Sequence, residues 1–285
     1  MSATYYQPSG KVSLFGIAGG LVVGGLAAVV TSFVYAAALV YIPIVQIAFL
    51  VPFGFGAISG AITVAIARRF KLRNRFVALA LALLTTGAAY AFSWVPWTYF
   101  TLSNAGVTDV GFVDLLNPLA LLGVLSEIYS VGAWSIGSNG SPVSGVMLGI
   151  CWLLEMIVVL GTAGAVGFTQ GAQGVFCEGC ESWCQEQPSL LRFTVAAEQE
   201  LLRRLGLRDI AVLGQMPRAT VGEASWLELK LSHCAGCGQT NTLLVERCVT
   251  TRDHRGNAVV RRAPLVTHLL IRPDEVTWLR GVTSR

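Results

Sequence analysis

The chain has 285 residues, of which 54% are hydrophobic and only 13% are charged, and its mean hydropathy is +0.63. Soluble domains usually carry nearly twice that fraction of charged residues, so this composition excludes a wholly soluble protein. The formal net charge of +4 is too small to indicate nucleic-acid binding by itself.

Charged residues are unevenly distributed along the chain. Residues 1–170 contain 6 Lys or Arg and 4 Asp or Glu, whereas residues 171–285 contain 14 and 12. We therefore predict a transmembrane domain over residues 1–170 and a water-exposed domain of ordinary polarity over residues 171–285.

The first part of the chain has room for four transmembrane helices. Residues 12–67 contain no charged residue, and one span needs about 20 residues, so this stretch predicts two spans. A turn is expected around residues 40–46, where Pro43 would break a helix. A cleaved signal peptide is not expected here, because its apolar core would be much shorter than this stretch. The four predicted spans cover about residues 13–40, 44–67, 76–97 and 143–168, the third ending in an aromatic sequence typical of the membrane interface.

The basic residues predict the orientation of these spans. Residues 68–75 contain five Lys or Arg, whereas residues 101–142 contain none. By the positive-inside rule, the first loop is cytoplasmic and the second lies outside. Four spans then return both termini to the cytoplasm, and we expect a multi-pass protein of the cell inner membrane.

A short apolar segment lies in the outer loop. The sequence predicts a helix over about residues 114–130 that begins at Asn117 and Pro118 and has Glu127 near its far end. Its apolar run is too short to span a bilayer. We expect an interfacial helix that lies on the membrane and seals the bundle, with a re-entrant segment as the alternative.

Small residues recur every four positions within the spans. This spacing lets helices approach closely in lipid, where hydrophobicity does not drive their association. It favours tight packing within one bundle, and a homo-oligomer interface is the open alternative. The repeats comprise Gly16, Gly20 and Gly24, then Gly56 and Gly60, then Gly145 and Gly149.

One charge, Glu155, lies inside a predicted span. An ionisable group there costs about 3 kcal/mol or more unless it is paired or hydrated, so Glu155 is a candidate for carrying a proton or a cation. The alternative, which we favour, is a protonated glutamate that bonds to a neighbouring helix. The other polar residues of the spans that could join it are Gln46, Ser59, Thr63, Thr85 and Thr86.

Two cysteine pairs with CxxC spacing predict a metal site. A two-residue spacer lets two thiolates reach one ion from a single tight turn, and glycine in or beside each spacer eases that turn. Soft thiolates suit zinc, and four of them leave no open position for catalysis. We predict a structural Zn²⁺ ion bound by Cys177, Cys180, Cys234 and Cys237.

This pattern resembles the zinc ribbon, a small β-rich fold in which two cysteine turns from different hairpins bind one ion. The resemblance covers the four cysteines and the β-rich runs 242–251 and 258–271. It implies a small α+β zinc-ribbon-like domain, here with a long insert between the pairs that contains a predicted helix at 195–205 and a strand at 225–233. Four spans followed by a CxxC motif also resemble bacterial polytopic membrane proteins, a likeness that implies no activity.

The sequence leaves other interpretations of the cysteines open. Cys184 and His233 are alternative ligands, although the four CxxC sulfurs already complete a tetrahedron. A thioredoxin-type redox pair opens a helix in a βαβ unit, a pattern that surrounds neither pair. Disulfides would require the domain to lie outside the cytoplasm, against the charge rule. We expect Cys151 and Cys248 to behave as small apolar side chains.

The remaining signals concern partners. The sequence contains no nucleophile–base set, phosphate-binding loop or HExxH motif, so it does not favour an enzyme. Residues 247–285 contain eight arginines and three acids, which makes anionic lipid headgroups a candidate partner. Nucleic acid ranks lower because no aromatic residues are interleaved with the arginines.

From these signals we predict an integral membrane protein that presents a structural zinc-ribbon module at the cytoplasmic face for protein or membrane-surface interaction. The alternative is a small transporter or channel component that uses Glu155, with the zinc ribbon as its regulatory domain.

Overall fold

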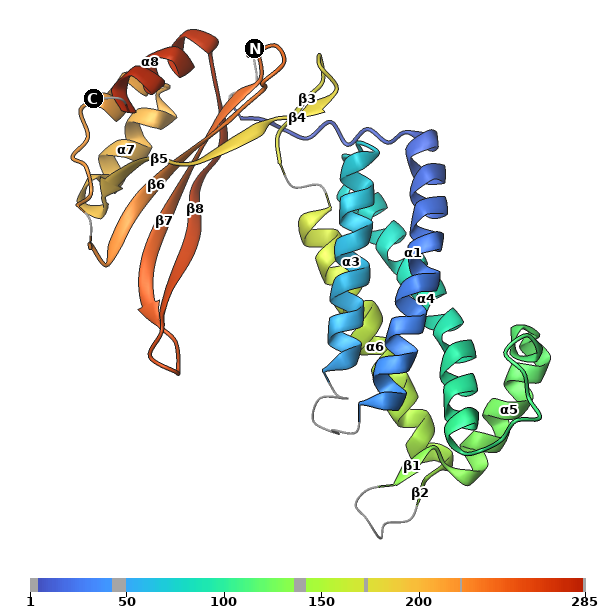
Figure 1. The fold of residues 1–285 in the computed structure, drawn as a ribbon. Helices are drawn as coiled ribbons and strands as arrows, with labels where there is room; N and C mark the ends of the chain where they lie inside the picture. The colour runs from blue at the N-terminus through green and yellow to red at the C-terminus, as the bar shows by residue number, and fades with distance from the viewer. Residues whose placement is uncertain (1–4, 43–49, 136–141, 172–173, 221, 284–285) are drawn as a thin grey trace. The chain divides into compact units, whose positions relative to one another are not determined.

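The computed structural model describes residues 5–42, 50–135, 142–171, 174–220 and 222–283 (Figure 1). The chain divides into two compact units. The helical unit comprises Ser9–Gln173, and the sheet unit comprises Gly174–Arg285 together with the N-terminal segment Met1–Pro8. Each unit is described by itself below.

The helical unit contains four helices that are long and apolar enough to cross a membrane. Ser13 begins the first of them, because its hydroxyl accepts a hydrogen bond from the backbone N–H of Gly16. Asn74 caps the third in the same way. Part of the predicted turn at residues 40–46 lies outside the described residues. The four helices are α1 (Leu14–Tyr41), α3 (Val51–Arg69), α4 (Arg75–Asn104) and α6 (Gly145–Gln170).

Helix α4 is longer than the predicted span of residues 76–97. It continues past Pro96 for two further turns, to Asn104. Proline removes one backbone donor, but transmembrane helices tolerate it because neighbouring helices and hydroxyl side chains satisfy the freed carbonyl. The aromatic sequence that we interpreted as a membrane boundary therefore lies within a continuous helix.

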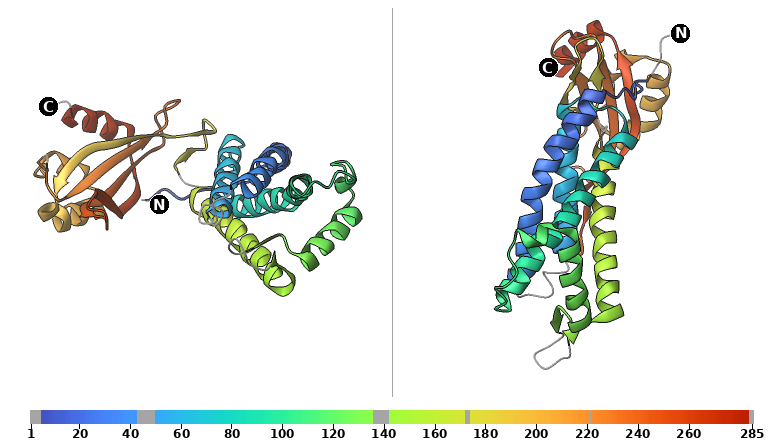
Figure 2. Two further views of the ribbon diagram at one scale, coloured as in Figure 1. Left: turned by 60° about the horizontal axis from the view of Figure 1, so that its bottom comes forward. Right: turned by 90° about the vertical axis from the view of Figure 1, so that its right-hand side faces the viewer.

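The four long helices lie side by side in both views of this unit (Figure 2). Helix α1 packs against α3 and α4, and α6 packs against the same two helices. The predicted role of the glycines in packing is confirmed at two of these contacts. A Cβ atom at Gly24 would lie 2.6 Å from the Thr85 side chain, and one at Gly56 would lie 2.5 Å from the carbonyl oxygen of Val159. Gly145 differs, because a Cβ atom there would meet nothing within 4 Å.

The predicted short helix is present as a 3-10 turn, η1 (Asp114–Leu116), followed by α5 (Pro118–Val131). Asn117 caps α5 through its side-chain oxygen, and Pro118 occupies the first turn. None of the residues of α5 is buried, and Leu119 is 80% exposed. The short strands β1 (Trp134–Ser135) and β2 (Pro142–Val143) pair with each other. The interfacial location of α5 stays a prediction.

The sheet unit is built on a four-stranded antiparallel sheet with strand order β5-β6-β7-β8. Helices α7 and α8 and the 3-10 turn η3 contribute leucine, isoleucine and valine side chains to one core with the strands. The elements are β5 (Gln185–Thr194), η2 (Val195–Ala197), α7 (Glu198–Gly206), η3 (Ile210–Gly214), β6 (Ser225–His233), β7 (Asn241–Arg252), β8 (Ala258–Ile271) and α8 (Pro273–Thr283).

Strands β6 and β8 match the predicted runs 225–233 and 258–271, and β7 extends the run 242–251 by one residue at each end. Strand β5 was not predicted, because its sequence begins with polar residues and contains Pro188. The pairing of β5 with β6 shifts between Gln187 and Leu191, and Ser189 has a φ of +53° within this irregularity. A bulge at the sheet edge accommodates the proline there.

The N-terminal segment belongs to the sheet unit. Tyr5 forms an isolated β-bridge with Leu269, and the backbone N–H of Tyr6 donates to the carbonyl of His268 at 2.9 Å. The Tyr6 hydroxyl accepts a hydrogen bond from the backbone N–H of Phe176 at 3.0 Å. Residues that precede the first long helix thus fold together with residues that follow the last one.

Candidate metal centre

Each CxxC pair lies in the connection of a β-hairpin. Strands β3 (Phe176–Cys177) and β4 (Ser182–Trp183) pair antiparallel, so Cys177 ends the first strand and Cys180 lies in the turn that follows. The second pair lies in the connection between β6 and β7, which is closed by a hydrogen bond from the Cys234 N–H to the Thr240 carbonyl at 2.9 Å. Two turns that are distant in sequence therefore bring four cysteines to one place.

The ligand atoms form one cluster. The Sγ atoms of Cys177, Cys180, Cys234 and Cys237 all lie within 4.8 Å of one another. Those of Cys177 and Cys237 are 3.6 Å apart, which is too long for a disulfide. A tetrahedral zinc ion with Zn–S bonds of about 2.3 Å places its sulfurs about 3.8 Å apart. The four side chains thus fit a metal ion with soft ligands. Their binding of zinc stays a prediction.

Glycine shapes the second turn. Gly238 has a φ of +64°, a conformation that residues with a Cβ atom rarely adopt. A Cβ atom at Gly236 would lie 3.2 Å from Cys180 Sγ, so a larger residue there would crowd the opposite pair. The prediction that glycine eases the tight turn of the cysteine pair is therefore confirmed at Gly236 and Gly238. A Cβ atom at Gly179, in contrast, would meet nothing within 4 Å.

Hydrogen bonds favour the thiolate at two of the four cysteines. The backbone N–H groups of Cys237 and Gly236 lower the pKa of Cys234 to about 6. The side chain of Thr240 lowers the pKa of Cys177 against the opposing effect of burial. In addition, the N–H of Gln239 donates to Cys237 Sγ at 3.5 Å. Such N–H···S contacts also support sulfur ligands around a bound metal.

The fourth thiol, Cys180, differs from Cys177 and Cys234 in the direction of its pKa shift. The sulfurs of Cys237 and Cys234 raise the pKa of Cys180 to about 12. Like charges at these distances oppose each other, so the four sulfurs are not all ionised by themselves. A divalent cation at their centre would remove that opposition and release the remaining protons.

The alternative ligands lie outside the four-sulfur group. Cys184 Sγ faces the carbonyl of Thr240 at 3.7 Å, and burial, followed by the nearby sulfurs, raises its pKa to about 12. His233 has a buried Nδ1 atom without a hydrogen-bond partner among the described residues, and burial followed by Arg280 lowers its pKa. Neither side chain belongs to the cluster of potential metal ligands in the described part of the chain.

The β3–β4 hairpin lies outside the main core of the sheet unit, although Phe176 is only 1% exposed. Phe176 and Trp183 pack edge to face with ring centroids 5.1 Å apart, and the Tyr6 hydroxyl bonds to the backbone of Phe176. The large core of the sheet unit contains no residue of this hairpin. Sequence reasoning did not identify Tyr6, because a tyrosine before an apolar helix carries no signal of a distant partner.

Glu155, the other predicted site residue, lies on α6 in the helical unit. Its carboxyl oxygen accepts a hydrogen bond from the hydroxyl of Tyr35 on α1. The Tyr35 ring stacks on Phe55 of α3 with centroids 4.2 Å apart. The expectation that serine or threonine would be the neighbour of Glu155 is therefore corrected, because an aromatic hydroxyl from α1 reaches it instead. Gln46 lies outside the described residues.

The chain matches no protein-family model, and no curated protein and no solved structure is significantly similar to it. Function is therefore inferred from the cysteine cluster, the four apolar helices and the chemistry of their side chains.

Proposed function

We propose that the chain is an integral membrane protein of the cell inner membrane that presents a structural zinc-ribbon module at the cytoplasmic face for protein or membrane-surface interaction. The observation that carries this proposal is the closed four-sulfur cluster, formed by two hairpin turns of a folded unit that accompanies four apolar helices. Four thiolates complete the coordination of zinc and leave no position for substrate, which favours a structural role.

The N-terminal segment supports the predicted topology. Tyr5 and Tyr6 precede α1, yet they pair with Leu269 and His268 of β8. Residues that fold together lie on the same side of a membrane, so an even number of spans separates them. The basic loop at residues 68–75 assigns that side to the cytoplasm. Reporter fusions after Arg75 and Arg285 should report the cytoplasm, and one near Ser138 should report the outside.

An arginine-rich hairpin offers a surface for the interaction. The β7–β8 hairpin exposes Arg252 at the end of β7, Arg255 in the connection and Arg261 on β8, and none of these has an acidic partner within 4.0 Å among the described residues. Neighbouring arginines differ, since Arg247 pairs with Glu198 and Arg262 with Glu228. Unpaired guanidinium groups near a bilayer attract anionic phospholipids, at about 1 kcal/mol for each basic residue at the surface.

This surface can be tested with the full chain in lipid nanodiscs. Amide hydrogen exchange at residues 252–258 should be slower in nanodiscs that contain phosphatidylglycerol than in phosphatidylcholine alone. Arg252→Gln together with Arg255→Gln should remove the difference, whereas Arg203→Gln together with Arg204→Gln, the loss of two paired arginines on α7, should preserve it. Equal exchange in both lipids would leave a protein as the partner, to be identified by crosslinking from this hairpin.

A second candidate function, transport that uses Glu155, draws on the position of this carboxyl group in an apolar helix. The hydrogen bond from Tyr35 supports a structural role instead, because it connects α6 to α1 in the way that a polar packing contact does. Proton or cation flux in reconstituted vesicles that is lost on Glu155→Gln would support transport.

A further inference from the structure

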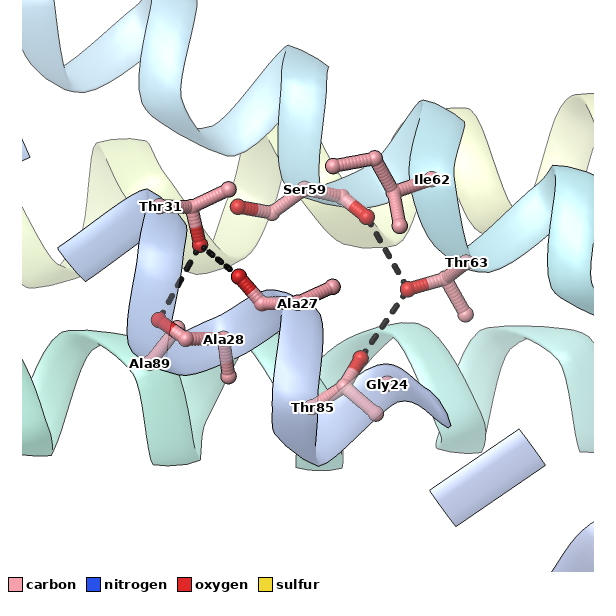
Figure 3. A pocket seen from close by; sticks show the side chains of 9 residues that line it. All are labelled: Gly24, Ala27, Ala28, Thr31, Ser59, Ile62, Thr63, Thr85 and Ala89. Atoms are coloured by element: carbon pink, nitrogen blue, oxygen red, sulfur yellow. Dashed lines mark hydrogen bonds between the residues drawn. The ribbon is translucent and has the colours of Figure 1, made fainter. Parts of the chain in front are cut away.

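Three long helices surround a small polar cavity in the helical unit. Helix α1 contributes Thr31, α3 contributes Ser59 and Thr63, and α4 contributes Thr85 (Figure 3). In Figure 3, Thr31 and the Ser59 hydroxyl lie toward one end of the cavity, and Thr63 and Thr85 lie toward the other. The rest of the lining is small or apolar: Gly24, Ala27, Ala28, Ile62 and Ala89.

The threonine hydroxyls already have acceptors for their protons. Thr31 donates to the carbonyl of Ala27 at 2.9 Å, and Thr85 donates to the carbonyl of Leu81 at 2.8 Å. Thr63 lies 2.9 Å from both the Ser59 carbonyl and the Thr85 hydroxyl. Each hydroxyl oxygen has two lone pairs, so these threonines can still accept hydrogen bonds from a molecule in the cavity.

Ser59 differs from the threonines. Its hydroxyl is buried and has no hydrogen-bond partner among the described residues, and only 7% of the residue is exposed. An unpaired hydroxyl in an apolar environment costs free energy. The space that the centre of a water molecule can occupy in the cavity is about 10 Å³. This is close to the smallest space that holds one water molecule, about 10–15 Å³.

We propose that this cavity binds a single water molecule, which accepts a hydrogen bond from the Ser59 hydroxyl and donates hydrogen bonds to threonine oxygens of the neighbouring helices. The water then has the two to four polar partners that a buried water needs. It connects α1, α3 and α4 at the point where Gly24 allows α1 to approach Thr85 closely. The site combines Gly24 of the small-residue repeat with Thr31, Ser59, Thr63 and Thr85.

Charge favours water over a metal cation. The lining contains no carboxylate, and Glu155 is not part of it. A monovalent cation in a membrane interior without a counter-charge would be strongly disfavoured, whereas a neutral water has only its hydrogen bonds to satisfy.

The sign of a stability change tests the proposal. If water satisfies Ser59, Ser59→Ala should lower the thermal unfolding midpoint of the full chain in detergent by about 2–4 °C. If the hydroxyl is unsatisfied, the same change should raise the midpoint, because it removes a buried polar group. Thr86→Val is the matched control: Thr86 is fully buried on α4 and its hydroxyl also lacks a partner among the described residues, but it does not line the cavity. The control should leave the midpoint unchanged or raise it.

Two further measurements identify the occupant. A density map of the full chain that resolves water should contain one peak about 2.7–3.0 Å from Ser59 Oγ. Replacing NaCl by LiCl, KCl or choline chloride at constant ionic strength should leave the unfolding midpoint unchanged. A midpoint that Ser59→Ala raises, or a map without the peak around a well-resolved Ser59, would overturn the proposal. If one cation raises the unfolding midpoint and Ser59→Ala removes that rise, the occupant of the cavity is that cation and not water.

Discussion

Among the described residues of the helical unit, the buried polar side chains are hydroxyls, mostly of serine and threonine, whereas in the sheet unit they include a carboxylate, Glu228, which is only 2% exposed. Several of these hydroxyls bond within or between helices: the Ser32 hydroxyl lies 2.5 Å from the carbonyl oxygen of Ala28 on its own helix and 2.6 Å from that of Ala89 on α4. Glu228 instead accepts from Ser189 and lies 3.5 Å from Arg262 and 3.6 Å from Arg192. Both arginines are about half exposed.

The surrounding medium explains this difference. A helix in lipid has no water at its outer face, so neutral groups that can bond to a backbone carbonyl are the polar side chains it can bury at low cost. A sheet in water can bury one carboxylate when partly hydrated arginines surround it, since their charge and hydrogen bonds offset the cost of desolvation. The four-cysteine cluster offers a parallel, because a bound cation would offset the repulsion among four thiolates at one place.

Removal of the metal should give the largest loss of amide protection of the variants considered. This loss should occur in the sheet unit and not in the helical unit. Zinc contributes about 10–16 kcal/mol to small domains that depend on it. Here the main core of the sheet unit does not include β3 or β4. We therefore expect chelation, or serine at any of the four cysteines, to abolish amide protection in the β3–β4 hairpin and weaken it in β6 and β7, with no change in α1, α3, α4 and α6.

The matched control for the metal variants is Cys184→Ser, since Cys184 lies beside the cluster but outside it. It should retain both the metal and the protection of the hairpin. Protection that is equal before and after chelation would mean that the hairpin does not depend on a metal.

Glu228→Gln should give the next largest effect, about 1.5–3 kcal/mol of unfolding free energy for a buried charge-assisted hydrogen bond. Burial acts to raise the pKa of Glu228, but Ser189, Cys248, Arg262 and Arg192 together lower it below its ordinary value. A depressed pKa stabilises the folded state above the ordinary carboxyl pKa of about 4.3, and this contribution is lost as the pH falls further. The stability difference between wild type and Glu228→Gln should therefore be constant from pH 7 to about 5 and shrink below that. A difference independent of pH would mean that Glu228 is not ionised.

Glycine packing in the helical unit should give a smaller effect that depends on position. Gly56→Ala should lower the unfolding free energy by about 1–3 kcal/mol, and the unfolding midpoint with it. The added Cβ atom would lie 2.5 Å from a carbonyl oxygen of α6. Gly54→Ala, two residues earlier on the same helix, would meet nothing within 4 Å and should be neutral or slightly stabilising. Equal effects at the two positions would contradict the contact between α3 and α6.

Tyr35→Phe should have the smallest effect, about 0.6–1.7 kcal/mol, the range for hydrogen bonds between membrane helices. Glu155→Gln retains hydrogen-bonding capacity in a similar volume, so it should fold with near-normal stability. Thermal unfolding of both variants in detergent checks this order. A Glu155→Gln variant that fails to fold would indicate that the carboxyl group has a second partner.

The sequence predicts the secondary structure of the helical unit more completely than that of the sheet unit. Long apolar stretches predicted all four long helices, because every face of such a helix contacts either lipid or another apolar helix. The four cysteines were predicted as a group, since only their spacing was needed. Strand β5 was missed because a bulge at Pro188 and Ser189 replaces regular alternation. The contacts of Tyr6 with β8, and of Tyr35 with Glu155, join residues more than a hundred positions apart, and no local pattern encodes such pairs.

The central claim, that two hairpin turns hold one structural zinc ion, is tested most directly by native mass spectrometry of the full chain released from detergent, with elemental analysis of the same sample. The account predicts one zinc per chain, retained in Cys248→Ser and lost when any one of Cys177, Cys180, Cys234 and Cys237 is replaced by serine. A chain without metal, in which Cys177 and Cys180 form a disulfide when the protein is taken from the cytoplasm, would contradict it.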